Sequence, residues 1–258
     1  QLGANTVARS LATLLFDAVE QEPLRNLKDF CLNAYAEAAR AGQTPEHHKT
    51  TQAIFPSKPP YETWFKDGVV RIDYVVDGDG STLGDALSYF ESKGFKEKSK
   101  ANGVTVLEFD AGPKGKLEVH LSSKKNNYQR NIFAKIDDPT FDVLVYSGHA
   151  SYGGHVDNAI ANGAGGSGED KLVVLFQCSG DVNIHSVENA FPDAQLLSTT
   201  STTTDTIDHR VLTSLLSGIL NRQEWPEIRS NALNRLENLS RVNPHYADFD
   251  KLRSLFFY

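Results

Sequence analysis

The sequence predicts an α/β fold in which helices cover both faces of a mostly parallel β-sheet, with a helical segment before it. First, residues 141–146, apart from Asp142, and residues 172–176 are apolar at consecutive positions rather than at alternate ones, as in strands buried on both faces. Second, segments with helical periodicity separate such runs. Third, 258 residues, 40% of them hydrophobic, can bury the core of one full domain with an additional segment.

The N-terminal segment and a linker are predicted from apolar spacing and proline content. Residues 1–56 carry two apolar stripes at helical spacing, and Cys31 lies on the second of them. We therefore expect its thiol to be buried and structural. Prolines then interrupt the pattern, and residues 57–66 are predicted to be a linker. Residues 67–258 form the predicted main domain, with helices at its C-terminal end.

The main domain is expected to alternate strands and helices. Continuously apolar or β-branched runs predict strands, and apolar residues at three- and four-residue spacing predict helices. The predicted elements are, in order, a strand at 69–76, a turn at 77–80, a helix around 83–90, strands at 104–109, 117–121, 141–146, 172–176 and 194–197, a Ser/Thr run at 198–204, and helices at 207–220 and 225–239. In open sheets of this kind, ligands bind at the carboxyl ends of the strands.

Composition argues against several classes of protein. The net charge of −7, from 33 acidic and 26 basic residues, disfavours a dedicated nucleic-acid-binding protein. No apolar run approaches the roughly 18 residues of a membrane-spanning helix, and we expect no signal peptide. Two cysteines cannot form a disulfide framework; they could form one bridge, but free thiols are the simpler interpretation and favour a reducing compartment. We therefore expect a cytoplasmic protein that binds neither nucleic acid nor membrane.

His149 and Cys178 are the residues best suited to chemistry. Each directly follows a predicted buried strand, so neighbouring strands would bring both side chains to the same edge of the sheet. A thiol beside an imidazole is the minimal apparatus of nucleophilic acyl transfer, because a nearby imidazole lowers a thiol pKa from its free value of roughly 8.5. Main-chain amides in the turns after the strands would stabilise the oxyanion.

These motifs resemble those of the caspase-like cysteine peptidases, which include caspases, metacaspases, legumain, gingipain and separase. The stretch Tyr146-Ser147-Gly148-His149 is similar to the metacaspase YSGH turn, and LVVLFQCSG looks like the block before the nucleophile. The resemblance spans roughly residues 69–222. Within it, VVRIDYVVDGDGSTLGDALSYFESKGFK is similar to the caspase opening strand, loop and helix, and AQLLSTTSTT to the segment that flanks the substrate groove.

The resemblance implies a caspase-like three-layer sandwich and a cysteine endopeptidase that needs no cofactor. Cys178 would attack the scissile carbonyl, and His149 would activate the thiol or protonate the leaving amine. The amides of Cys178 and Ala150 would form the oxyanion hole. The sequence departs from the family at Ala150, where most members have Gly, and at Gln177, where they have Ala or Cys.

The resemblance also implies a specificity pocket between the loop after the first strand and residues near the nucleophile. The residues expected to bind substrate are Asp77, Asp79, Gln177, Asp181, Ser198 and Thr199. Carboxylates in a partly desolvated pocket favour a guanidinium, so we expect cleavage of a protein or peptide substrate after Arg or Lys. Alternatively, the acidic residues after the first strand form only a turn, since Asp-Gly is a common turn pair.

Two other interpretations remain open. A zinc site could be built from His149, His155, Cys178 and His185, which lie in predicted loops after strands. The domain could also be a catalytically silent caspase-like interaction module. The predicted N-terminal helices would then offer a surface to a partner.

Overall fold

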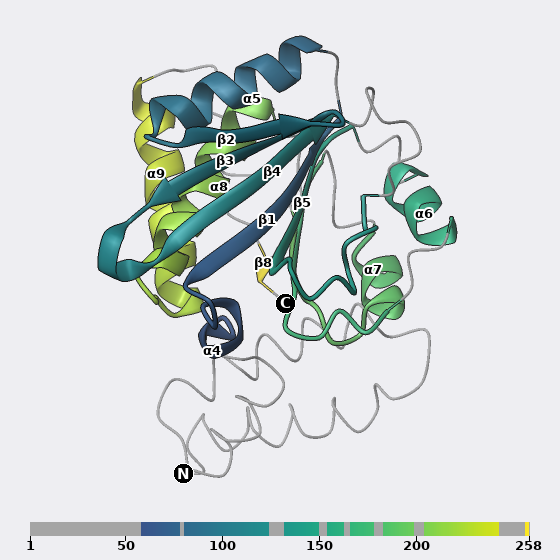
Figure 1. Cartoon of the computed structure of the whole chain (residues 1–258). Helices are drawn as coiled ribbons and strands as arrows, with labels where there is room; N and C mark the ends of the chain where they lie inside the picture. Colours follow the sequence, from purple (N-terminus) through teal and green to yellow (C-terminus); the bar gives the residue numbers. More distant parts are fainter. Residues whose placement is uncertain are drawn as a thin grey trace, which may run out of the picture. The chain divides into compact units, whose positions relative to one another are not determined.

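A computed structural model of the chain describes residues 58–77, 80–123, 132–149, 154–162, 166–177, 183–198, 204–242 and 256–257 (Figure 1). The chain divides into two units, Gln1–Ser57 and Lys58–Tyr258, and every described residue belongs to the second. The helices predicted for residues 1–56, and Cys31 with them, lie outside the described residues.

The described strands form one mixed sheet. They are β1 Val69–Val76, β2 Lys96–Ala101, β3 Val104–Asp110, β4 Lys116–Ser123, β5 Val143–Gly148, β6 Leu172–Gln177, β7 Gln195–Ser198 and β8 Phe256–Phe257. Their order across the sheet is β2-β3-β4-β1-β5-β6-β7-β8. The five central strands run parallel to one another. The pairs β2–β3, β3–β4 and β7–β8 are antiparallel.

Helices cover both faces of this sheet, as the sequence predicts. Helices α5 (Gly80–Ser92), α8 (Asp205–Leu220) and α9 (Trp225–Val242) lie on one side, and α6 (Gly154–Ala161) and α7 (Ile184–Ala190) on the other (Figure 1). Strands β1, β5 and β6 are buried at nearly every position. Their side chains enter two separate hydrophobic clusters, one on each face. Burial on both faces is why β5 and β6 carry apolar runs without alternation.

The strands and helices predicted between residues 69 and 239 are confirmed, with ends within three residues of those observed. Among the elements that the sequence did not predict are β2, α6 and α7. β2 has the sequence KEKSKA and is exposed throughout, so no apolar pattern marks it. α6 and α7 have only eight and seven residues, too few for a clear helical period. A 3-10 turn, η1 (Gly112–Lys114), joins β3 to β4. None of the described helices combines the length and apolar character needed to span a membrane.

The predicted linker at residues 57–66 is wrong. Helix α4 (Tyr61–Trp64) lies inside it, and Trp64 is only 1% exposed. The indole of Trp64 donates a hydrogen bond to the carbonyl of Asp170, and the phenol of Tyr61 donates to that of Gln223. The prolines do not oppose this helix, because Pro60 is its N-cap residue, where the missing N–H of proline costs no helical hydrogen bond. Residues 58–66 therefore belong to the α/β domain.

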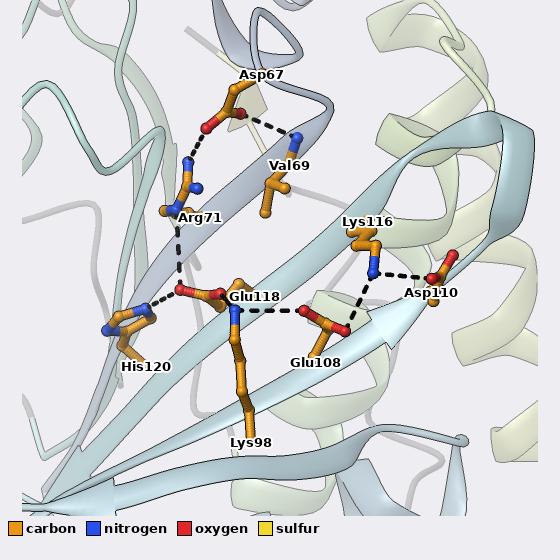
Figure 2. A network of polar contacts seen from close by, with 9 residues as sticks. All are labelled: Asp67, Val69, Arg71, Lys98, Glu108, Asp110, Lys116, Glu118 and His120. Carbon is orange, nitrogen blue, oxygen red and sulfur yellow. Dashed lines mark hydrogen bonds and ion pairs between the residues drawn. The ribbon is translucent and has the colours of Figure 1, made fainter.

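Strands β3 and β4 have one apolar face, and their opposite face carries a polar network that extends to β2. On the polar face, Glu118 lies 2.5 Å from Lys98 Nζ and 2.6 Å from His120 Nε2, and 3.8 Å from Arg71 Nε. The network continues to Asp67, Val69, Glu108, Asp110 and Lys116 (Figure 2). Partial burial alone raises the pKa of Glu118, but the hydrogen bonds from Lys98 and His120 outweigh it and hold that pKa below its usual range.

The strand order brings two strand ends together where the topology reverses. β1 lies between β4 and β5, so the chain passes from one side of β1 to the other after β4. Open α/β sheets bind ligands at the carboxyl ends of strands at such a reversal. Because β1 ends at Val76 and β5 at Gly148, Asp77 and His149 follow at this edge.

Candidate functional site

The predicted catalytic residues follow two strands that are neighbours in the sheet. Gly148, the last residue of β5, is the parallel partner of Gln177, the last residue of β6. His149 and Cys178 come next in the sequence. Because neighbouring strands lie about 4.8 Å apart, the two strands end side by side at the carboxyl edge of the sheet.

The structure describes some of the predicted site residues and not others. Those outside the described residues are Asp79, Ala150, Cys178, Asp181 and Thr199. Those described are Asp77, His149, Gln177 and Ser198.

The side chain of His149 is exposed, whereas its main chain is held by two other side chains. Its carbonyl oxygen accepts hydrogen bonds from Tyr146 Oη at 3.1 Å and from His155 Nδ1 at 2.7 Å. Because a carbonyl oxygen can only accept, Nδ1 of His155 carries the proton in this contact. The basic nitrogen of a neutral His155 ring is then Nε2.

Asp77 joins this group from the end of β1. Its Oδ2 lies 2.9 Å from Tyr146 Oη, whose single proton is shared between Asp77 and the His149 carbonyl, and 3.1 Å from His155 Nδ1. Burial, together with the negative charge of Asp77, raises the pKa of Tyr146 above its usual range, so the phenol remains a donor at neutral pH. We call Asp77, Tyr146, His155 and the main chain of His149 the edge cluster.

Gln177 is buried, which corrects the prediction that it binds substrate. Its exposed fraction is 0%, and its Nε2 donates to Asn183 Oδ1 at 2.6 Å. Asn183, the N-cap residue of α7, donates from Nδ2 to Asp157 Oδ1 of α6 at 3.0 Å. The Gln177 side chain therefore fastens the end of β6 to the helix layer and does not face a ligand.

Ser198 is a second correction. Its exposed fraction is 1%, and its hydroxyl donates to the carbonyl of Leu175 at 3.5 Å. Ser198 and Leu175 are also register partners in β7 and β6. The predicted substrate-binding serine is thus part of the sheet, and a substrate cannot touch its side chain.

The end of β5 is bonded on both faces of the sheet. Ser147 Oγ donates to Asp208 Oδ2 at 2.6 Å, and both residues are 1% exposed. Asp208 lies in the first turn of α8. Consecutive strand residues point to opposite faces, so Tyr146 bonds toward the α6 side while Ser147 bonds toward α8. This double attachment limits the freedom of the segment that leads to His149.

The described residues group proton donors and acceptors here rather than metal ligands. Among them, no three His, Cys, Asp or Glu residues are arranged to hold a metal ion. Of the four predicted zinc ligands, the side chains of His149 and His155 are described, and those of Cys178 and His185 are not.

Several residues of the site were not identified from the sequence. Tyr146 lies in the YSGH motif that drew attention to His149, but the motif does not reveal what its hydroxyl bonds. Asp157 and Asn183 are 26 residues apart, and no local spacing connects them. The same is true of Ser147 and Asp208, which are 61 residues apart.

The fold and the edge cluster define an α/β protein with a mostly parallel sheet and a candidate site at the carboxyl ends of β1, β5 and β6. No protein-family model matches the chain, and no curated protein matches its sequence. The function is therefore inferred from the residues and their geometry.

Proposed function

We propose that the protein is a cysteine endopeptidase with a caspase-like fold, in which Cys178 is the nucleophile and His149 the general acid and base. The observation that carries this proposal is the pairing of Gly148 with Gln177 in neighbouring parallel strands. The pairing supports a dyad because His149 directly follows Gly148 in the sequence and Cys178 directly follows Gln177.

The proposed reaction needs only this dyad, two main-chain amides and water. His149 accepts the thiol proton, and the Cys178 thiolate attacks the carbonyl carbon of the peptide bond. The N–H groups of Cys178 and Ala150 donate hydrogen bonds to the tetrahedral oxyanion. As the C–N bond breaks, His149 gives the proton to the leaving amine. Water, deprotonated by His149, then attacks the thioester and releases the acid and the thiol.

The proposal also includes a caspase-like architecture for the α/β domain. It is supported by five parallel central strands between helix layers, and by a His and a Cys that follow adjacent strands. The resemblance in the sequence implies the same arrangement.

We further propose that cleavage follows Arg or Lys. Asp77 supports this preference, because its carboxylate lies in the edge cluster beside His149 and is 18% exposed. A partly desolvated carboxylate attracts a guanidinium by charge and by bidentate geometry. No Lys or Arg lies in the sequence between Arg71 and Lys93 to neutralise this loop. Asp79 and Asp181 would add negative charge.

Cysteine and histidine variants test the dyad. The wild-type protein is expected to hydrolyse fluorogenic peptides that carry Arg or Lys before the cleaved bond. A peptidyl vinyl sulfone should label it once per chain, as read by intact mass. Cys178→Ala should abolish both signals, because the attacking sulfur is gone. His149→Ala should lower kcat by about 10²- to 10⁴-fold, the usual contribution of a general acid and base.

Cys31→Ala is the matched control, and it should retain both hydrolysis and labelling. Hydrolysis at near wild-type rate by Cys178→Ala would exclude the proposed mechanism. Labelling of Cys178 without hydrolysis of any library member would point to a silent domain instead. About one zinc ion per chain by elemental analysis, lost in His155→Ala, would favour the zinc interpretation.

A further inference from the structure

Helix α6 is bonded directly to the segment after β5 and, through Asn183, to the end of β6. His155, its second residue, donates from Nδ1 to the carbonyl of His149 at 2.7 Å. Asp157, two residues later, accepts from Asn183 at 3.0 Å, and Asn183 accepts from Gln177 at 2.6 Å. One helical turn therefore contacts the main chain of the proposed base and, through Asn183, the residue that precedes the proposed nucleophile.

The inner hydrogen bond of this connection is shielded from water, whereas the contacts of His155 and Asp157 are more exposed. Gln177 and Asn183 are 0% exposed, so water does not compete for their hydrogen bond. On the other branch, Nδ1 of His155 also lies 3.1 Å from both Asp77 Oδ2 and Tyr146 Oη. These groups come from the ends of β1 and β5, so together with Asn183 of α7 three separate segments contact His155 and Asp157 directly.

The fold of α6 does not depend on these two polar side chains alone. Val156, which lies between them in the sequence, is 0% exposed and packs in the hydrophobic cluster under α6 and α7. Burying a valine side chain contributes about 1.5–3 kcal/mol. The hydrophobic contact therefore anchors the helix, and its polar neighbours are available to set the geometry of the strand ends.

We propose that His155 and Asp157 are positioning residues, which set through α6 the distance and orientation between the His149 imidazole and the Cys178 thiol. This inference rests on the proposed function of His149 and Cys178. Neither positioning residue needs to touch the substrate. Proton transfer between a thiol and an imidazole requires close alignment, and a displacement of about 1 Å can reduce a rate by about 100-fold.

Paired substitutions in α6 test this role. His155→Ala removes the donor to His149, whereas His155→Asn retains a side-chain N–H near the position of Nδ1. Asp157→Ala removes the acceptor of Asn183, whereas Asp157→Asn retains a carbonyl oxygen. Asn158→Ala, at an exposed position of the same helix, is the control for changes in helix composition.

The readouts are kcat and KM for a peptide ending in Arg, and the rate at which iodoacetamide alkylates Cys178. Both alanine variants are expected to lower kcat by about 100-fold with KM nearly unchanged. Alkylation should slow as well, because the imidazole no longer stabilises the thiolate. The asparagine variants should recover most of the activity, and Asn158→Ala should match the wild type. Urea unfolding checks that each variant is folded. If His155→Ala is not folded, His155→Gln is used in its place.

Unchanged kcat in both alanine variants of an active enzyme would overturn the positioning role and leave the proposed function standing. Equal losses in the alanine and asparagine variants would overturn it too, since the hydrogen bonds would then not be the cause. If His155→Ala is as inactive as His149→Ala and His155→Asn is not rescued, His155 is the base itself and the inference fails. If the wild type hydrolyses no peptide and Cys178 reacts no faster than Cys31, the proposed function fails and the inference fails with it.

Discussion

Two contacts between a carboxylate and a histidine, Glu118–His120 and Asp77–His155, resemble each other only when each is considered by itself. Glu118 and His120 lie two residues apart on β4, with 2.6 Å between Oε1 and Nε2. Asp77 and His155 come from the end of β1 and from α6, with 3.1 Å between Oδ2 and Nδ1. Both histidine side chains are partly buried, at 22% and 29% exposure.

Their surroundings differ. Glu118 is compensated by Lys98 and Arg71, and the whole network lies on the face of the sheet, with His120 opposite the middle of β1 (Figure 2). The Asp77–His155 contact lies at the carboxyl edge and continues to the main chain of His149. The comparison teaches that a carboxylate–histidine pair does not indicate function by itself. What such a pair can do depends on where it lies relative to the strand ends and on which further group it bonds.

The largest expected effect is on substrate preference, which should depend on Asp77 of the edge cluster and not on Glu118 of the sheet face. Asp77→Asn removes a charge from the edge cluster, and kcat/KM for cleavage after Arg should fall by about 100-fold, because a hydrogen bond to a charged group contributes up to about 3 kcal/mol. Glu118→Gln removes the same charge from the sheet face and should leave the preference intact. A fluorogenic library that varies the residue before the cleaved bond measures both. An unaltered preference for Arg in Asp77→Asn would contradict the acidic pocket.

A smaller effect is expected where the edge cluster loses only a hydroxyl. Tyr146→Phe removes the donor to Asp77 and to the His149 carbonyl, and should lower the free energy of unfolding by about 1–2 kcal/mol. It should also reduce kcat, because the turn that carries His149 is held less firmly. Urea denaturation and peptide kinetics provide the two measurements.

Tyr89→Phe is the matched control, since the Tyr89 hydroxyl lies 3.1 Å from Thr213 Oγ1, away from the edge cluster. It should affect stability without affecting kcat. Equal kinetic losses in the two variants would mean that the edge cluster has no special influence on His149.

The smallest expected effect is on the free energy of unfolding when Glu118, on the face of the sheet, is substituted. This effect should depend on pH. The pKa of Glu118 in the folded protein lies below its ordinary value of 4.5, so the folded state binds fewer protons than the unfolded state. This contribution to stability is complete above the unfolded pKa and is lost as the pH falls through the folded pKa. Glu118→Gln should therefore cost about 1 kcal/mol at neutral pH, and the difference from wild type should disappear in acid. Urea titrations across that range measure it, and a difference that grows on acidification would refute this account.

Much of the fold could be predicted because a buried strand can be recognised from the apolar character of its own residues. A run rich in β-branched residues at 69–76 and consecutive apolar residues at 172–176 marked β1 and β6 correctly. β2 could not be found in this way, because an exposed edge strand is held by its main-chain hydrogen bonds to β3 and needs no apolar side chains. The prediction of a linker at residues 57–66 failed for a similar reason. The prolines of this segment are visible in the sequence, whereas the partners that bury Trp64 are distant in it.

For the site, the sequence alone determined that His149 and Cys178 each follow a buried strand and that Asp77 follows another. Only the tertiary structure decided that β5 and β6 are neighbours, with Gly148 opposite Gln177. It also decided that the Gln177 and Ser198 side chains are buried and that α6 is bonded directly to the segment after β5 and, through Asn183, to the end of β6. The physical reason is the range of the interactions. Apolar periodicity is set by residues a few positions apart, whereas the hydrogen bond between Asp157 and Asn183, 26 residues apart, exists only once α6 and α7 pack on the same face of the sheet.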